Sequence, residues 1–191
     1  MRHAHTSWNG PPRRYQGRLD VSISEVGKSD ARESTFDFSQ IDLVISSPAL
    51  RCRETIRALS YNFENIFFDP RLWEIDMGIF SGRYEKEVML EYPELYCNWQ
   101  SNPTATKIPK GESFGCFYER VIEMMSEILQ LSFEKNILLM THGGVMRLLY
   151  CHYKKISYNQ FNGIKIKNLA IFSFDGYCYS ELLTSPRVQE L

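Results

Sequence analysis

The chain has 191 residues, 43% of them hydrophobic and 24% charged, with a formal net charge of −1. This length is typical of a single domain with a substantial core, and the charge excludes bulk attraction to nucleic acid or to an anionic membrane. The chain contains no apolar run of the roughly 18–20 residues that span a membrane, and no apolar signal-peptide core at its start. Five scattered cysteines without a C-x-x-C pair indicate reduced thiols, so we expect a cytoplasmic protein.

The N-terminal half predicts a loop followed by a strand–turn–helix unit. The stretch up to about Gly27 is rich in Gly, Pro and Arg, although "SISEVG" carries a helix-start signal. "IDLVISS" (41–47) is a short apolar run that predicts a buried strand. "PALRCRETIRALS" follows directly and predicts a helix with Pro48 in its first turn. "NIFFD" predicts a second short strand.

The C-terminal half predicts further helices and a second strand–turn–helix unit. "EKEVMLEYPELYCNW" predicts a helix interrupted near Pro93, and Ser113 is expected to cap a long helix with an apolar stripe. "NILLM", "THGG" and "VMRLLYCHY" predict a strand, a tight turn and a helix, and "LAIFSFDGYCYSELL" predicts a hairpin that turns at "DG". Two strand–turn–helix units predict an α/β fold, a three-layer sandwich whose mostly parallel central sheet is flanked by helices.

Polar side chains occupy three turns that this fold places at one sheet edge. Arg2 and His3 lie in the first, Arg51 and Arg53 follow "VISS", and His142 lies in "THGG". The carboxyl edge of an open α/β sheet is where ligands bind. Each residue alone has a plainer interpretation, since a single histidine is usually structural and a single helical arginine is usually a surface charge. Their occurrence together, in order, favours a binding site.

The residue types in these turns favour phosphate chemistry. Arginine presents a planar fork of donors that suits phosphate oxygens, and helix N-termini add backbone N–H groups. Gly143 and Gly144 allow an anion close to the main chain. A histidine nitrogen beside such a pocket can attack phosphorus, while arginines stabilise the charge of the transition state.

Six motifs in order show a resemblance to a known family. They are Arg2-His3-Ala4-His5-Thr6 with Asn9, "YQGRLDVSISEVG", "SSPALRCRET", "LWEIDMGIFSG", "PKGES" and "THGGV". Over Arg2 to about Phe174 the sequence resembles the histidine phosphatase superfamily, the phosphoglycerate-mutase-like group, and it looks most similar to the α-ribazole phosphatases.

The resemblance implies a role for each matching residue. His3 is expected to be the nucleophile that becomes phosphohistidine, and Glu74 the general acid that later acts as a base. Without the family, Glu74 is simply an exposed acid near a strand end. Arg2, Arg51 and His142 are expected to hold the phosphoryl group. The further substrate-binding residues that we expect are Asn9, Gly17, Gly143 and Arg53, the last of which either lines the mouth or faces solvent. We expect no cofactor.

The sequence also departs from the family pattern. Ala4 replaces the usual glycine, and His5, interpreted as a bystander or a substrate-side contact, replaces an acid or amide. His3 and His5 are joined by no cysteine or acid, so we expect no metal site. His152 is expected to be structural.

The family carries an apolar strand before the Arg-His motif, whereas only Met1 precedes Arg2 here. The expectation is therefore a truncated N-terminal strand, either from a misplaced start or in the product itself. Losing a buried strand should cost more than the roughly 5–15 kcal/mol that a domain has to spare.

We expect a single domain over residues 1–191, with a helical lid at about 83–112. The extra basic residues of mutases are not evident after Glu74, which favours water as the acceptor and hence a phosphomonoesterase. Tyr96 and Trp99 either stack on a nucleoside-like base or belong to the core. The predicted substrate is a small phosphate ester, α-ribazole 5′-phosphate of cobalamin synthesis.

Three alternatives stay open. The first is a broad-specificity sugar or glycerate phosphatase, or a phosphoglycerate mutase. The second is a non-catalytic module that binds a phosphorylated ligand, and the third is a fragment without a stable fold. The sequence does not determine the oligomeric state, and a homodimer stays open.

Overall fold

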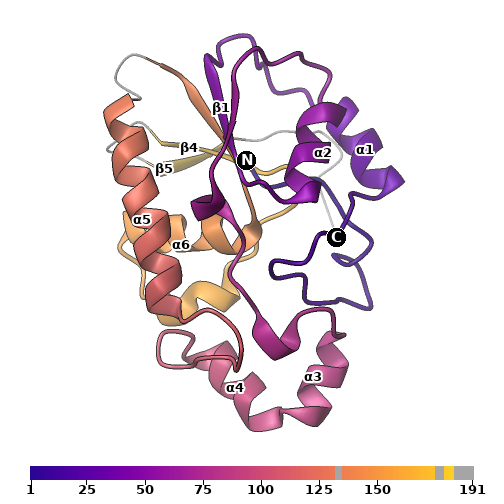
Figure 1. Ribbon diagram of the computed structural model, residues 1–191, viewed down its shortest axis with the longest axis vertical. Helices are drawn as coiled ribbons and strands as arrows, with labels where there is room; N and C mark the ends of the chain where they lie inside the picture. The colour runs from indigo at the N-terminus through magenta and orange to yellow at the C-terminus, as the bar shows by residue number, and fades with distance from the viewer. Residues whose placement is uncertain (132–134, 175–178, 183–191) are drawn as a thin grey trace.

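Three short parallel strands form the centre of the molecule (Figure 1). The computed structural model describes residues 1–131, 135–174 and 179–182. Strand β1 (Leu43–Ser46) pairs with β2 (Ile66–Phe68) along one edge and with β3 (Ile137–Met140) along the other. All three strands lie within the runs predicted from the sequence, and the parallel sheet confirms the α/β prediction.

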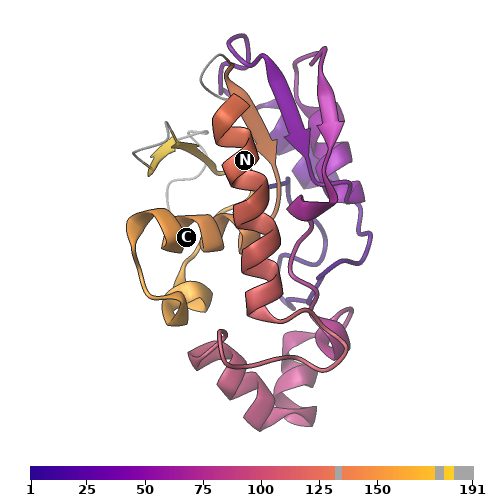
Figure 2. The ribbon, with the colours of Figure 1, turned by 60° about the vertical axis from the view of Figure 1, so that its left-hand side comes forward.

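Helices cover both faces of this sheet (Figures 1 and 2). Val44, Leu138 and Met140 belong to a core cluster with buried residues of α1 (Glu25–Arg32) and α2 (Leu50–Ala58). Ile45, and the partly buried Leu43 and Leu139, belong to the cluster of α5 (Phe114–Leu131) and α6 (Gly143–Lys154). Because successive strand residues point to opposite faces, this alternation produces the three layers that the sequence predicts.

The first three residues pair with the second edge of β3. Arg2 bridges Thr141 in parallel, and the His3 amide donates to the Thr141 carbonyl oxygen at 2.9 Å. On the other side, the Arg2 amide donates to the Ala170 carbonyl oxygen at 3.0 Å. The Met1 amino group donates to the Leu139 carbonyl oxygen at 2.6 Å, and burial lowers its pKa to about 5. These bonds hold His3 at the carboxyl edge of the sheet.

A cavity of about 500 Å³ lies beside this edge of β3 and is lined by Met1, Ile137 and Leu139, among others. It adjoins the position where the sequence predicts a truncated strand. Within the described residues, Met1–His3 are the segment that pairs with β3 on this side. Both the truncation and its stability cost stay predictions.

The helix ends follow local signals, with one correction. The Ser24 hydroxyl accepts from the Gly27 amide at the start of α1, and Ser113 accepts from the Cys116 amide at the start of α5. Both confirm the sequence prediction. The prediction for Pro48 is wrong, because α2 begins at Leu50 with Ala49 as its N-cap. Pro48 lies in the turn before the helix.

The remaining elements surround this core. The helix predicted around Pro93 is two helices, α3 (Glu85–Glu91) and α4 (Pro93–Ser101). Strands β4 (Ile171–Phe174) and β5 (Tyr179–Leu182) pair antiparallel as the predicted hairpin, whose "DG" turn lies outside the described residues. Short 3₁₀ helices are η1 (Pro70–Leu72), η2 (Gly78–Phe80) and η3 (Tyr158–Gly163).

Helices α3 and α4 form one end of the molecule, at the bottom of Figures 1 and 2. They belong to the segment 83–112 for which the sequence predicts a lid. Trp99 is only 3% exposed and packs edge-on against Phe161 of η3, while Asn162 donates to its carbonyl oxygen. Trp99 is therefore a core residue, which was one of its two interpretations.

An arginine of α5 holds the segment that carries Glu74. Arg120 donates to both carboxylate oxygens of Glu112, at 2.7 and 2.8 Å, and to the carbonyl oxygens of Trp73 and Glu74, at 2.8 and 3.2 Å. Glu112, of the "PKGES" motif, is itself tied to Asp76, since its amide donates to the Asp76 carbonyl oxygen. Burial opposes the charge of Glu112, but the hydrogen bonds from Arg120 lower its pKa below the usual range.

We predict that Arg120→Met lowers the free energy of unfolding by about 3 kcal/mol, because it leaves the largely buried Glu112 carboxylate with only the more exposed Arg18 as an ion-pair partner and removes the donor to several carbonyl groups. Denaturant unfolding measures the change. The control is Arg83→Met, which removes the exposed ion pair with Glu91 and should cost at most about 1 kcal/mol. Equal losses in the two variants would show that the Arg120 contacts contribute no more than a surface pair.

Candidate active site

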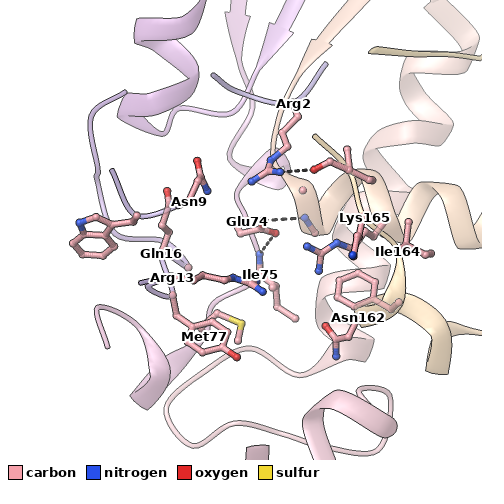
Figure 3. A pocket seen from close by; sticks show the side chains of 18 of the residues that line it. Arg2, Asn9, Arg13, Gln16, Glu74, Ile75, Met77, Asn162, Ile164 and Lys165 are labelled. Carbon is pink, nitrogen blue, oxygen red and sulfur yellow. Dashed lines mark hydrogen bonds between the residues drawn. The ribbon is translucent and has the colours of Figure 1, made fainter. Parts of the chain in front are cut away.

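A cavity of about 430 Å³ opens at the carboxyl edge of the sheet (Figure 3). Several segments meet there: the first nine residues, the loop 13–17, the Glu74 segment, the start of α6 and the stretch after η3. Seven residues predicted from the sequence line it, namely Arg2, His3, Asn9, Gly17, Arg51, Glu74 and Gly143.

His3 has one ring nitrogen occupied and one available. Nδ1 lies 2.7 Å from the Ala4 carbonyl oxygen. Because a carbonyl oxygen only accepts, Nδ1 carries the proton and Nε2 keeps its lone pair. Burial, together with the positive charges of Arg2 and Arg51, holds the pKa of His3 well below its usual value of 6.5. His3 is therefore a neutral imidazole at physiological pH, as a nucleophile requires.

The Glu74 carboxylate is fixed by two backbone amides. Oε2 accepts from the Gly144 amide at 2.9 Å and Oε1 from the Ile75 amide at 3.0 Å, and Figure 3 shows the side chain in the cavity below Arg2. The Gly144 bond places the carboxylate at the N-terminus of α6, where the helix dipole favours negative charge. A Cβ on Gly144 would overlap Glu74 Oε1, so only glycine permits this approach.

His142 lies behind His3 and is not among the residues that line the cavity. Its ring packs edge-on against His3, with 5.4 Å between centroids. Arg51 Nε donates to His142 Nδ1 at 3.1 Å, so His142 Nε2 carries the proton and donates to Ser47 Oγ at 2.8 Å. Burial and the charge of Arg51 hold the pKa of His142 well below 6.5. In this arrangement His142 supports His3 from within the core.

Arg51 is buried and already holds three partners. Besides His142, its guanidinium donates to the carbonyl oxygens of Gly17 and Leu19, each at 2.8 Å. A guanidinium has five N–H groups, so two are left for a ligand. Gly17 has a φ of +51°, and a Cβ added there would lie 2.7 Å from Ser81 Oγ, so backbone conformation and space both favour glycine.

Arg2 and Asn9 face the cavity with donors to spare. Arg2 Nη1 donates to the Ile166 carbonyl oxygen, while its buried Nε has no hydrogen-bond partner among the described residues. Burial and the neighbouring Arg147 lower the pKa of Arg2 to about 10, so it stays charged at neutral pH. Asn9 Oδ1 accepts from the Thr6 amide at 2.9 Å, which turns the amide NH₂ toward a ligand.

Three other sequence candidates lie outside this cavity. Arg53 is exposed, and its guanidinium lies 5.9 Å from the centroid of the Phe68 ring. His5 Nδ1 lies 2.8 Å from Ser24 Oγ and so supports the start of α1. His152 Nδ1 lies within 3.3 Å of the Tyr118 and Tyr158 hydroxyls. The structure thus brings none of these three to the site. Nor does the described part of the chain hold a group of three or more His, Cys, Asp or Glu residues that could bind a metal.

The cavity also contains residues that the sequence analysis missed. Arg13, Gln16, Arg147, Asn162 and Lys165 all line it. Arg147 carried a signal, since it stands four positions after Gly143 on a predicted helix and therefore on the same face. Arg13 and Lys165 lie in irregular segments, where no periodicity indicates direction.

We predict that Gly144→Ala lowers kcat by about 10²-fold or more, because the new methyl displaces the Glu74 carboxylate and general acids contribute about 10²–10⁴-fold. Phosphate release measures the loss, and circular dichroism shows that the fold is kept. The control is Gly115→Ala in α5, where the nearest atom to an added Cβ is Ser113 Oγ at 3.9 Å. Full activity in Gly144→Ala would contradict the importance of this carboxylate position.

Comparison with known proteins identifies the family of this chain. The model of the histidine phosphatase superfamily (branch 1) matches residues 1–182. The chain is 34% identical over 165 residues to phosphoserine phosphatase 1 of Hydrogenobacter thermophilus, across 84% of this chain and 77% of that protein. It is 33% identical over 156 residues to phosphoglycerate mutase-like protein 4 of Arabidopsis thaliana, across 78% and 67%.

Among solved structures, the fold is similar to the α-ribazole phosphatase of Shigella flexneri, with a TM-score of 0.82 and 21% identity over 100% of this chain and 96% of that one. This likeness concerns the fold alone. No helix in the described ranges is long and apolar enough to cross a membrane. The family match over nearly the whole chain and the phosphatase relative together show that the protein belongs to the histidine phosphatase superfamily and is a phosphoric monoester hydrolase.

Proposed function

We propose that the protein hydrolyses phosphate monoesters in two steps, without a metal, through a phosphohistidine at His3. The observation that carries this proposal is the His3 imidazole, neutral and with its Nε2 unprotonated, in a cavity that also holds the Glu74 carboxyl group and the Arg2 and Arg51 guanidiniums. These groups supply a nucleophile, a proton carrier and positive charge for a phosphoryl group.

In the first step, the lone pair of His3 Nε2 attacks phosphorus and the bond from phosphorus to the ester oxygen breaks. In this step Glu74 must carry a proton; it donates this proton to the leaving oxygen and becomes the carboxylate that the Gly144 amide and the start of α6 favour. Arg2 and the two unoccupied N–H groups of Arg51 stabilise the negative charge on the equatorial oxygens. The Nδ1 bond to Ala4 stabilises the positive charge that the ring acquires.

In the second step, the Glu74 carboxylate takes a proton from water as the water oxygen attacks phosphorus. The phosphorus–nitrogen bond breaks, its electron pair returns to Nε2, and inorganic phosphate leaves. Both residues end in their starting states. His142 acts as a positioning residue, because it packs against His3 without lining the cavity.

We predict that His3→Ala abolishes phosphate release from an aryl phosphate measured in EDTA, whereas the untreated and EDTA-treated wild-type enzymes are equally active. Acid-labile phosphate should form on wild type and be absent from the variant. His5→Ala is the matched control, since His5 lies two residues away and outside the cavity. Labelling that survives His3→Ala would contradict the proposal. So would a protein that melts cooperatively and binds phosphate without turnover, which is the binding-module alternative.

We predict that kcat/KM, corrected for the second ionisation of the substrate, does not decrease as the pH falls through 6.5. The pKa of His3 is held well below 6.5, so the neutral, nucleophilic form persists below the pH at which an exposed histidine gains its proton. The pH profile of kcat/KM reports the free enzyme. A loss of activity centred near pH 6.5 would show that His3 titrates as an exposed histidine does.

Two phosphate esters are candidates for the natural substrate. The sequence-based candidate is α-ribazole 5′-phosphate of cobalamin synthesis, and the name of the relative at 34% identity suggests phosphoserine. Trp99 lines the cavity but is only 3% exposed and contacts Phe161 edge-on. Little of its ring is therefore free to stack on a nucleoside base, which favours the second candidate. Phosphate release from both esters, compared as kcat/KM, decides between them.

A further inference from the structure

A tight turn just before β4 lies against the first residues of the chain. The Ala170 amide donates to the Lys167 carbonyl oxygen at 3.3 Å, so Asn168 and Leu169 are the central residues of this turn. Leu169 has a φ of +61°, a left-handed conformation that glycine or asparagine normally adopts at this position of a turn. A bulky residue keeps such a conformation only where the surrounding structure enforces it, and residues of this kind cluster at active sites.

The backbone of the turn is bonded to Arg2 on both sides of that residue. The Leu169 amide donates to the Arg2 carbonyl oxygen at 3.1 Å, and the Arg2 amide donates to the Ala170 carbonyl oxygen at 3.0 Å. The Leu169 side chain is 9% exposed and belongs to the same core cluster as Met1. Two backbone bonds and the burial of a leucine thus offset the strain and fix the turn beside His3.

The turn directs the Asn168 side chain at two residues of the site. Asn168 Nδ2 donates to the His3 carbonyl oxygen at 2.9 Å and to Asn9 Oδ1 at 3.2 Å. A side-chain amide has two N–H groups, so these two bonds use both of them. Asn168 is not among the residues that line the cavity. It can therefore act on a bound phosphate only through its neighbours.

Asn9 Oδ1 accepts hydrogen bonds from two separate parts of the chain. The Thr6 amide and hydroxyl donate to it at 2.9 and 3.2 Å, and Asn168 donates from the turn before β4. Because both Thr6 donors belong to one residue, they alone would let the Asn9 amide pivot about that residue. Asn168 supplies the second fixed point, and the Asn9 NH₂ group stays available to the cavity that Asn9 lines (Figure 3).

We propose that Asn168 is a positioning residue, whose side-chain amide fixes the Asn9 amide relative to His3 so that Asn9 donates to a phosphoryl oxygen. Without Asn168, the Asn9 amide can turn its carbonyl oxygen toward the cavity, and this oxygen only accepts hydrogen bonds. An anion is then repelled where it was bound. This inference rests on the proposed function and adds to it a residue that acts without touching the substrate.

The test is a double-mutant cycle at Asn168 and Asn9, with kcat/KM for an aryl phosphate as the readout. Asn168→Ala should lower kcat/KM by about ten-fold, the lower end of the range for a hydrogen bond to a charged group. In the Asn9→Ala background the same change should cost at most about three-fold, because the group that Asn168 orients is gone. The control is Asn65→Ala, which removes an exposed amide that donates to the Asp42 carbonyl oxygen at 3.4 Å and should keep full activity.

Two results would overturn the proposal. The first is an equal loss in the two backgrounds, because a purely structural residue disturbs His3 whether or not Asn9 is present. The second is an unchanged kcat/KM in Asn168→Ala. Asn168→Asp covers the case in which Asn168→Ala does not fold, since it keeps the shape of the side chain, and its carboxylate has no hydrogen to donate. At pH 8 it should lose at least about ten-fold, and full activity counts against the role of Asn168.

Calorimetry with inorganic phosphate separates this proposal from the proposed function, because binding needs no turnover. Asn168→Ala should raise the Kd of phosphate by about five-fold or more, and by at most about two-fold when Asn9→Ala is also present. If no ester is hydrolysed while this coupling is present, the phosphohistidine mechanism fails and the positioning role stands. If acid-labile phosphate forms on His3 while neither kcat/KM nor Kd shows coupling, the mechanism stands and the positioning role fails.

Discussion

The site depends on the pairing of Met1–His3 between β3 and the segment before β4. The His3 amide bonds to Thr141 on one side and the Arg2 amide to Ala170 on the other. Residues 1–3 are thereby hydrogen-bonded on both sides, as an internal strand is. The positions of His3 and Arg2 depend on these backbone bonds, because no disulfide or covalent anchor holds this described segment.

A second constraint brings Glu74 close to His3. Glu74 lies in an irregular segment, and such segments are normally the mobile part of a domain. Here Arg120 of α5 donates to the backbone carbonyl oxygens of Trp73 and Glu74 and to the Glu112 carboxylate. The Glu112 amide in turn donates to the Asp76 carbonyl oxygen. The carboxylate then meets the Gly144 amide at the start of α6. Helices α5 and α6, on one face of the sheet, thus position Glu74, whereas the bonds to β3 position His3.

Charge is distributed unevenly in this molecule. The chain as a whole is almost neutral, whereas one cavity collects six basic residues around a single acid. Burial has different effects on the histidine and on the arginines of this cavity. It keeps His3 neutral, as a nucleophile must be, and it strengthens the attraction of the arginines for an anion by excluding water. The single acidic residue, Glu74, leaves the cavity with a net positive charge that attracts anions.

Local patterns in the sequence determined most of the elements. The short apolar runs became the three parallel strands, Ser24 and Ser113 became helix caps, and Pro93 separated two helices. The motif residues at the ends of the strands predicted the family. The turns that follow parallel strands meet at one edge of the sheet, whatever the length and path of the other loops. Pro48 shows the limit of such signals: a proline predicts a nearby helix start, but the first helical residue can lie one or two positions away.

Only the tertiary structure decided which polar side chains share the cavity. Arg51 and Arg53 are two positions apart on one helix, so they point in different directions, and one is buried at the site while the other lies over Phe68. His142 follows β3 and packs edge-on against His3, yet it bonds to Ser47 and does not line the cavity. Arg13 and Lys165 arrive from loops whose paths no periodicity describes. The sequence determines which residues lie at the sheet edge. Which of these residues face the cavity depends on side-chain direction and on the paths of the loops, and both are set by long-range packing.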